Sequence, residues 1–179
     1  MQQAKAFLTT RKEEETAHVG ELLGYILNQP LVIALDGELG TGKTVFVRGA
    51  AAGLGVEDQQ VSSPSFVLLK IYHGRLPVYH FDFYRLSAEE DPLELGFEEY
   101  LPGGGAAFIE WAGRLPRLLP PAYLQVNIER FDDYTGEGRR IWFIPFGPVA
   151  SRTVESLLGA VTWHIDGNLC KQKPRNILP

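Results

Sequence analysis

The stretch LVIALDGELGTGKT, residues 31–44, decides the fold. Its first five residues are an uninterrupted apolar run, which is typical of a strand buried on both faces of a parallel sheet. Its last eight match the pattern G-x-x-x-x-G-K-[ST] in full. Helical spacing follows as far as Leu54, just before Gly55. A buried strand, a glycine-rich turn and a helix in this order predict a phosphate-binding loop.

Each part of the loop has a chemical role. Glycines let backbone amides turn towards phosphate oxygens, and the following helix points its positive end at the anion. The Lys43 ammonium can reach the β- and γ-phosphates, and the Thr44 hydroxyl can ligate Mg²⁺. We therefore expect ATP and Mg²⁺ as ligands. The expected nucleotide contacts are Gly37, Glu38, Leu39, Gly40, Thr41, Gly42, Lys43, Thr44 and Val45.

Strand and helix patterns alternate around this unit. Strands are expected at residues 5–10, 31–35, 66–72, 76–82, 106–111, 123–129 and 139–146, and helices at 13–29, 43–54, 88–100 and 151–160. The alternation predicts an α/β fold, a P-loop NTPase-like three-layer sandwich with a central mixed, mainly parallel sheet. We expect one domain over residues 1–160 and a C-terminal tail over 161–179, which lacks periodicity.

Composition limits the partners and the compartment. The net charge is −5, from 17 basic and 22 acidic residues, without the basic excess that a protein binding nucleic acid alone usually shows. If an RNA is involved, we therefore expect a partner protein to hold it. Cys170 is the sole cysteine, and no apolar run approaches the ~20 residues of a membrane span. We expect a cytoplasmic protein, not bound to a membrane and monomeric when alone.

Two carboxylates follow later apolar runs. Asp82 ends the segment PVYHFD and is a candidate for a direct or indirect Mg²⁺ contact, and Glu110 ends AAFIE and is a candidate for orienting the attacking water. The candidate metal-binding residues are thus Thr44, Asp82 and Glu110, and the candidate catalytic residues are Glu110, Lys43 and Asp82. From the residues alone, a solvated carboxylate at a strand end is an equally good interpretation of either acid.

Two further segments stay open. In HFDFYR, residues 80–85, a strand would place His80 and Asp82 on the same face. No second histidine has a spacing suited to a metal site, so a packed or hydrogen-bonded histidine is the favoured interpretation of His80. The paired hydroxyls of Ser63 and Ser65 fit either a turn cap or a loop that contacts the nucleotide.

Together, GELGTGKT, SPSF (63–66), HFDFYR and IEW (109–111) resemble the bacterial TsaE (YjeE) family, ATPases of tRNA threonylcarbamoyladenosine synthesis. The resemblance covers residues 7 to 146. It implies weak ATP hydrolysis that supports two partner proteins, TsaD and TsaB, which carry out the transfer to tRNA. It also implies an Mg²⁺ role for Asp82 and a water-activating role for Glu110. Possible switch or partner contacts are Ser63, Ser65, His80, Tyr84, Arg85 and Trp111.

The chain departs from the family pattern at three positions. Ser65 stands where threonine is common, Glu38 where aspartate is usual and Thr41 where alanine is usual. A hydroxyl survives at Ser65, and the other two are interior positions of the loop that remove no phosphate ligand.

Three rival functions remain at this level. A small-molecule kinase would need an arginine-bearing lid. Arg114 and Arg117 could serve, but no lid is evident in the sequence. A GTPase would normally carry an N-K-x-D guanine reader, and no such tetrapeptide occurs in the chain. A nucleotide-sensing interaction module with negligible turnover would keep the same phosphate loop.

Overall fold

The computed structural model describes residues 5–57, 61–64, 67–87, 96–97, 100, 104–134 and 136–161. Its strands are β1 (Ala6–Thr10), β2 (Leu31–Asp36), β3 (Leu69–Tyr72), β4 (Val78–Asp82), β5 (Ala106–Glu110), β6 (Tyr123–Asp133) and β7 (Gly136–Phe146). Its helices are α1 (Glu13–Ile26), α2 (Lys43–Gly53) and α3 (Pro148–Ala160), and two 3₁₀ turns cover Ala112–Arg114 and Pro116–Leu118.

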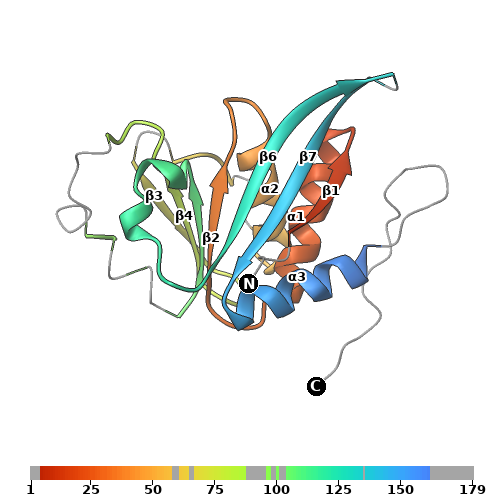
Figure 1. Ribbon diagram of the computed structural model, residues 1–179. Helices are drawn as coiled ribbons and strands as arrows, with labels where there is room; N and C mark the ends of the chain where they lie inside the picture. The colour runs from red at the N-terminus through yellow and green to blue at the C-terminus, as the bar shows by residue number, and fades with distance from the viewer. Residues whose placement is uncertain are drawn as a thin grey trace.

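The strands form one mixed sheet in the order β1-β7-β6-β2-β5-β4-β3 (Figure 1). The four strands β6, β2, β5 and β4 are parallel, and the outer pairings are antiparallel. Because β1 is antiparallel to β7, which is itself antiparallel to β6, β1 runs with the central four. Five of the seven strands therefore point the same way, which confirms the predicted mixed, mainly parallel sheet.

The central strand β2 is buried on both faces, as its apolar run predicts. Ile33 and Leu35 face a core formed with α1, α2 and α3, whereas Val32 and Ala34 face a second core with Phe81 and other rings. Within the described residues, the two 3₁₀ turns and an aromatic cluster cover this second face, opposite the helices (Figure 1). The alternation follows from the period-two geometry of a strand.

Several element boundaries differ from those expected. β3 begins at Leu69, because Leu68 adopts a positive φ of 64°, and β5 ends at Glu110 rather than at residue 111. The first helix ends at Ile26, where the Arg75 guanidinium donates to the carbonyls of Gly24 (2.9 Å) and Leu27. The last helix begins earlier than expected, at Pro148.

Two further expectations concern regions outside the described residues. Most of the helix expected at 88–100 lies there and stays a prediction. Its last part is wrong, because Gly96 has a positive φ of 66° and an α-helix cannot continue through it. The tail also stays a prediction, because α3 ends at Ala160 and the description ends at residue 161.

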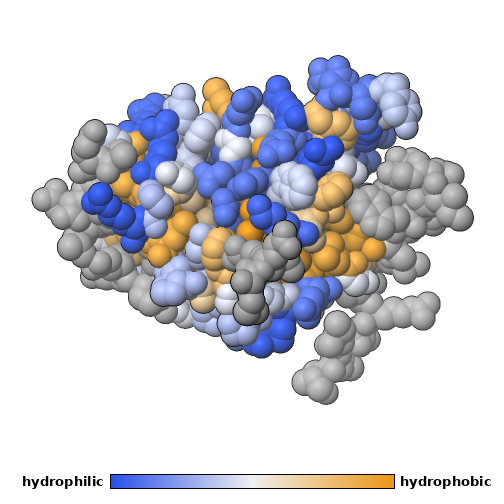
Figure 2. All heavy atoms as spheres, viewed as in Figure 1, coloured by the Kyte–Doolittle hydropathy of each residue, from blue (hydrophilic) through white to orange (hydrophobic). Residues whose placement is uncertain are grey.

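The β6–β7 hairpin extends beyond the rest of the sheet. Its register pairs Arg130 with Arg139 and Asp133 with Gly136, and Tyr134 at its tip is fully exposed. The surface over this hairpin is mainly hydrophilic (Figure 2), in keeping with its exposed Asp132. The end of the hairpin is therefore exposed to solvent and does not contribute to the core.

Glycines allow α1 and α2 to pack backbone against backbone. A Cβ added at Gly49 would lie 1.9 Å from the Ala17 carbonyl oxygen, and one added at Gly20 would lie 2.1 Å from that of Phe46. Backbone atoms cannot move aside as a flexible side chain can. The distance between the two helices, and hence the position of the start of α2, depends on these glycines.

We expect Gly49→Ala to lower the free energy of unfolding by about 1–3 kcal/mol or more, because the methyl group forces α1 away from α2. Urea denaturation followed by circular dichroism measures the change. Gly159→Ala in α3 is the matched control, since a Cβ there meets nothing within 4 Å. The control should be neutral or stabilising by roughly 0.5–1 kcal/mol, and equal losses in both variants would contradict the packing argument.

Candidate functional site

The glycine-rich loop joins the end of β2 to the start of α2, as predicted. Gly37, Gly40 and Gly42 have φ values of 143°, 76° and 106°, a region that side chains rarely adopt. A Cβ on Gly37 would also lie 2.3 Å from the Ile128 carbonyl oxygen. Gly42 caps α2 without a side-chain hydrogen bond, so the first amides of the helix remain for an anion.

Lys43 is folded back onto the loop. Its ammonium donates to the carbonyl oxygens of Gly37 (2.7 Å) and Glu38 (2.8 Å) and lies 3.9 Å from the centre of the Trp111 ring. Burial lowers the pKa of Lys43, and the negative charges of Glu110, Asp82 and Asp36 oppose that shift. The Lys43 ammonium and the first amides of α2 lie beside each other. Together they are suited to bind a polyanion such as a triphosphate.

The two predicted carboxylates lie side by side because β4 and β5 are parallel and in register, with Asp82 opposite Glu110. The Thr44 hydroxyl donates to Oε1 (2.8 Å) and Oε2 (3.1 Å) of Glu110. Ser63 donates to Asp82, whose Oδ1 also accepts the Tyr84 amide (2.9 Å). The fold thus brings together all three predicted metal-binding residues.

These groups line a cleft of about 440 Å³. Its lining residues are Leu39, Gly40, Gly42, Lys43, Thr44, Val45, Ser63, Asp82, Tyr84, Arg85, Glu110 and Trp111. Of the other expected contacts, Gly37 and Glu38 supply carbonyl oxygens to Lys43, and the Thr41 hydroxyl donates to Glu38 (3.0 Å). Ser65 lies outside the described residues, and its proposed role stays a prediction.

The donor set suits Mg²⁺. Within the described ranges, no group of three or more His, Cys, Asp or Glu side chains forms a cage for a metal ion. Mg²⁺ rarely uses such a cage: it prefers oxygen ligands, keeps several waters, and binds through one or two carboxylates together with substrate phosphates. Thr44, Asp82 and Glu110 offer one hydroxyl and two carboxylates beside the phosphate loop, so the residues present fit this ion.

The backbone of Trp111 does not continue the extended conformation of β5. It follows β5 in the left-handed conformation (φ 61°) that bulky residues avoid. Its ring contacts that of Tyr84 (5.1 Å between centres), and Arg114 lies over both rings. The sequence pattern treated Trp111 as the end of a strand. The structure instead places it as the wall of the cleft next to Lys43.

His80 does not line the cleft. It is fully buried on β4, and its Nε2 lies 2.8 Å from Oε1 of Glu110. The favoured interpretation, a hydrogen-bonded core histidine, is confirmed. The partner is one of the site carboxylates, which the sequence did not indicate.

Sequence reasoning missed two arginines that touch the loop. Arg130 donates to the carbonyl of Gly40 (2.7 Å), and Arg139 donates to that of Thr41 (3.2 Å). The two lie directly opposite each other in the hairpin, an arrangement that is unfavourable for like charges unless each has a partner. Strand register sets this pairing, so no local sequence pattern indicated it.

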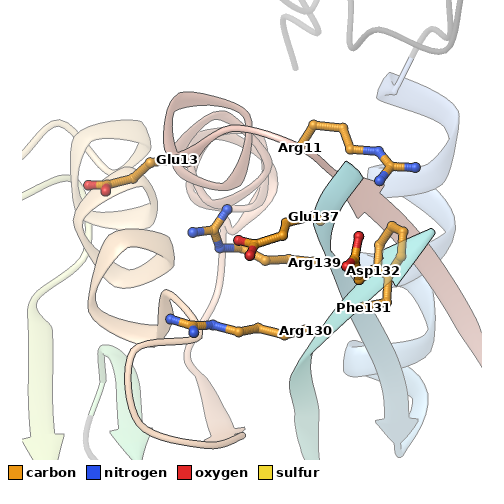
Figure 3. Close-up of a pocket in the computed structure, with 8 residues that line it drawn as sticks. Arg11, Glu13, Arg130, Phe131, Asp132, Glu137 and Arg139 are labelled. Atoms are coloured by element: carbon orange, nitrogen blue, oxygen red, sulfur yellow. The ribbon is translucent and has the colours of Figure 1, made fainter. Parts of the chain in front are cut away.

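A second cavity, of about 470 Å³, lies between the loop and the β6–β7 hairpin (Figure 3). Arg130 and Arg139 extend in the same direction from the hairpin, towards the loop. The cavity is lined by Arg11, Glu13, Arg130, Phe131, Asp132, Glu137, Gly138 and Arg139. Three arginines and three acids line it, so their formal charges sum to zero.

Comparison with known proteins decides the family. The family model described as "Threonylcarbamoyl adenosine biosynthesis protein TsaE" matches residues 10–141. The chain belongs to the TsaE family. The protein named tRNA threonylcarbamoyladenosine biosynthesis protein TsaE in Treponema pallidum is 40% identical over 124 residues, which are 69% of this chain and 91% of that protein. The one in Bacillus subtilis is 39% identical over 139 residues, 77% and 84% of the two chains.

A solved structure agrees with the TsaE assignment. The crystal structure of Bacillus subtilis YdiB superposes with a TM-score of 0.74 at 32% identity, covering 89% of this chain and 97% of that one. The TsaE match spans the loop, both carboxylates and the hairpin arginines and ends within β7. Across the described residues, no helix has the length and apolar content needed to cross a membrane.

Proposed function

We propose that this TsaE-family chain is an Mg²⁺-dependent ATPase that supports threonylcarbamoyl modification of adenosine in tRNA, acting with TsaB and TsaD. The observation that carries the proposal is the contact of Thr44 with Glu110 beside Asp82, at the mouth of the glycine-rich loop. Hydrolysis of a bound triphosphate needs a metal site and a residue that positions water at this place.

The residues divide the work as follows. The amides of the loop and of the first turn of α2 bind the phosphates, and Lys43 exchanges its loop carbonyls for phosphate oxygens. Thr44, Asp82 and Glu110 would hold Mg²⁺, which when bound offsets negative charge on the β- and γ-phosphates. Glu110 accepts a hydrogen bond from the attacking water, and Trp111 shields the phosphates from bulk solvent.

The nucleoside is assigned to the cavity of Figure 3. It adjoins the loop through Arg130 and Arg139 and includes the Phe131 ring. The Arg11 guanidinium lies over this ring, 4.6 Å from the ring centre. A base would take the place of Arg11 over this ring. The phosphates would stay at the loop amides and Lys43. This places the two ends of ATP on opposite sides of the loop.

Partners complete the proposal. TsaD and TsaB would carry out the transfer, and tRNA would be met only through them. The chain would be a monomer when alone. A cytoplasmic location belongs to the proposal, because the modified substrate is a tRNA. A kinase would instead transfer phosphate rapidly to a metabolite without these partners, and a sensing module would bind ATP without turnover.

Lys43→Ala is expected to weaken ATP binding by on the order of 100-fold or more, because a charge-assisted contact to the phosphates is lost. Isothermal titration calorimetry measures the affinity. Lys5→Ala is the matched control, since this exposed lysine precedes β1. Unchanged ATP affinity in Lys43→Ala would reject nucleotide binding at the loop.

Phe131→Ala is expected to weaken ATP by about tenfold and to leave inorganic tripolyphosphate unchanged, because base–aromatic stacking contributes roughly 1–3 kcal/mol. Calorimetry with both ligands separates the nucleoside from the phosphates. Tyr134→Ala at the exposed hairpin tip serves as the control. An equal effect of Phe131→Ala on both ligands would remove the nucleoside from this cavity.

Glu110→Gln should retain ATP and lower kcat for hydrolysis roughly 10²- to 10⁴-fold, because the carboxylate that takes up the water proton is neutralised. Phosphate release gives the rate. Adding TsaB and TsaD should raise the turnover of the wild type and leave the variant near its own basal rate. A full rate in Glu110→Gln would exclude this carboxylate from hydrolysis, and turnover indifferent to both proteins would reject the partnership.

A further inference from the structure

His80 is a buried titratable group that the proposed mechanism has not used. It is fully buried on β4, and its ring lies on the same face of the sheet as Asp82 and Glu110. The register pairs His80 with Phe108, so the imidazole reaches Glu110 diagonally, at 2.8 Å from Nε2 to Oε1. Burying a polar ring in this position is costly unless it is hydrogen-bonded.

The geometry identifies which nitrogen carries the proton. Within the part of the chain that the structure describes, Nδ1 of His80 is buried and has no hydrogen-bond partner. A proton on Nδ1 would be a buried donor without an acceptor, a cost of roughly 1–3 kcal/mol. A proton on Nε2 instead meets the Glu110 carboxylate. His80 is therefore the donor in this contact.

The two oxygens of Glu110 are held unequally. Oε1 accepts both from His80 and from the Thr44 hydroxyl, each at 2.8 Å, whereas Oε2 has a longer contact of 3.1 Å with Thr44. Two short bonds on one oxygen fix the rotation of the carboxylate. Glu110 lines the cleft, and Oε2 is the oxygen with fewer and longer contacts.

We infer that His80 is the positioning residue for Glu110: it anchors Oε1 from behind the cleft and so aims Oε2 at the metal and water side of the ATP site. The inference rests on the proposed function and deepens it. It requires no change in the charge of His80, only a hydrogen bond donated from a fixed place. Side chains that orient a ligating or catalytic carboxylate typically contribute 10- to 100-fold to activity or metal affinity.

Comparing His80→Leu with His80→Gln tests the inference. Leucine removes the donor, whereas the glutamine amide can place an N–H near the position of Nε2. In His80→Leu, kcat should fall roughly 10- to 100-fold, and His80→Gln should recover most of the loss. The exposed His73 provides the control His73→Leu. Thermal unfolding monitors the fold, and His80→Asn, whose shorter amide cannot reach Glu110, replaces His80→Leu if that variant does not fold.

A second measurement does not depend on turnover. Calorimetry gives the gain in ATP affinity on adding Mg²⁺, which should shrink in His80→Leu and return in His80→Gln. A wild type that hydrolyses no ATP even with TsaB and TsaD would overturn the proposed function alone, and this calorimetric comparison still decides the role of His80. An Mg²⁺ gain equal in His80→Leu and wild type would overturn the inference.

The combination with Glu110→Gln shows whether His80 acts through Glu110. If it does, His80→Leu adds little further loss of kcat in the Glu110→Gln background. A loss in that background as large as in the wild type would mean that His80 acts elsewhere, and would also overturn the inference.

Discussion

The parallel pairing of β2, β5 and β4 is the constraint on which the site depends. Parallel strands end at the same edge of a sheet, and the register places Leu35 opposite Glu110 and Glu110 opposite Asp82. The loop that follows β2 and the carboxylates at the ends of β5 and β4 therefore lie together at one edge of the sheet. A slip of one residue would turn Glu110 to the other face of the sheet.

Burial of the two carboxylates fixes their orientation as well as their position. Asp82 and Glu110 are each only 3% exposed, so an unpaired charge there would be costly. Hydroxyl donors from Thr44 and Ser63 satisfy them, and His80 adds a donor to Glu110. Lys43, buried under Trp111, supplies the opposite charge. The same contacts that make the buried acids tolerable also hold them where a metal and a water would be used.

Rigid surroundings hold the loop itself. The glycine contacts between α1 and α2 fix where α2 starts, and the hairpin arginines bind the loop from the other side. The TsaE-family chain thus places a cleft at the start of α2 on one side of the loop and a cavity that contains the Phe131 ring on the other. A ligand with an anionic and a neutral end matches this division.

The sequence by itself determined the loop, the buried strand before it and the helix after it, because these are set by neighbouring residues and by periodicity. It also indicated Asp82 and Glu110, since both end apolar runs. Only the tertiary structure decided that Thr44 and His80 share Glu110, that Trp111 turns back over Lys43, and that Arg130 and Arg139 support the loop. These contacts join residues between 30 and 98 positions apart, and strand register, not local pattern, sets which of them meet.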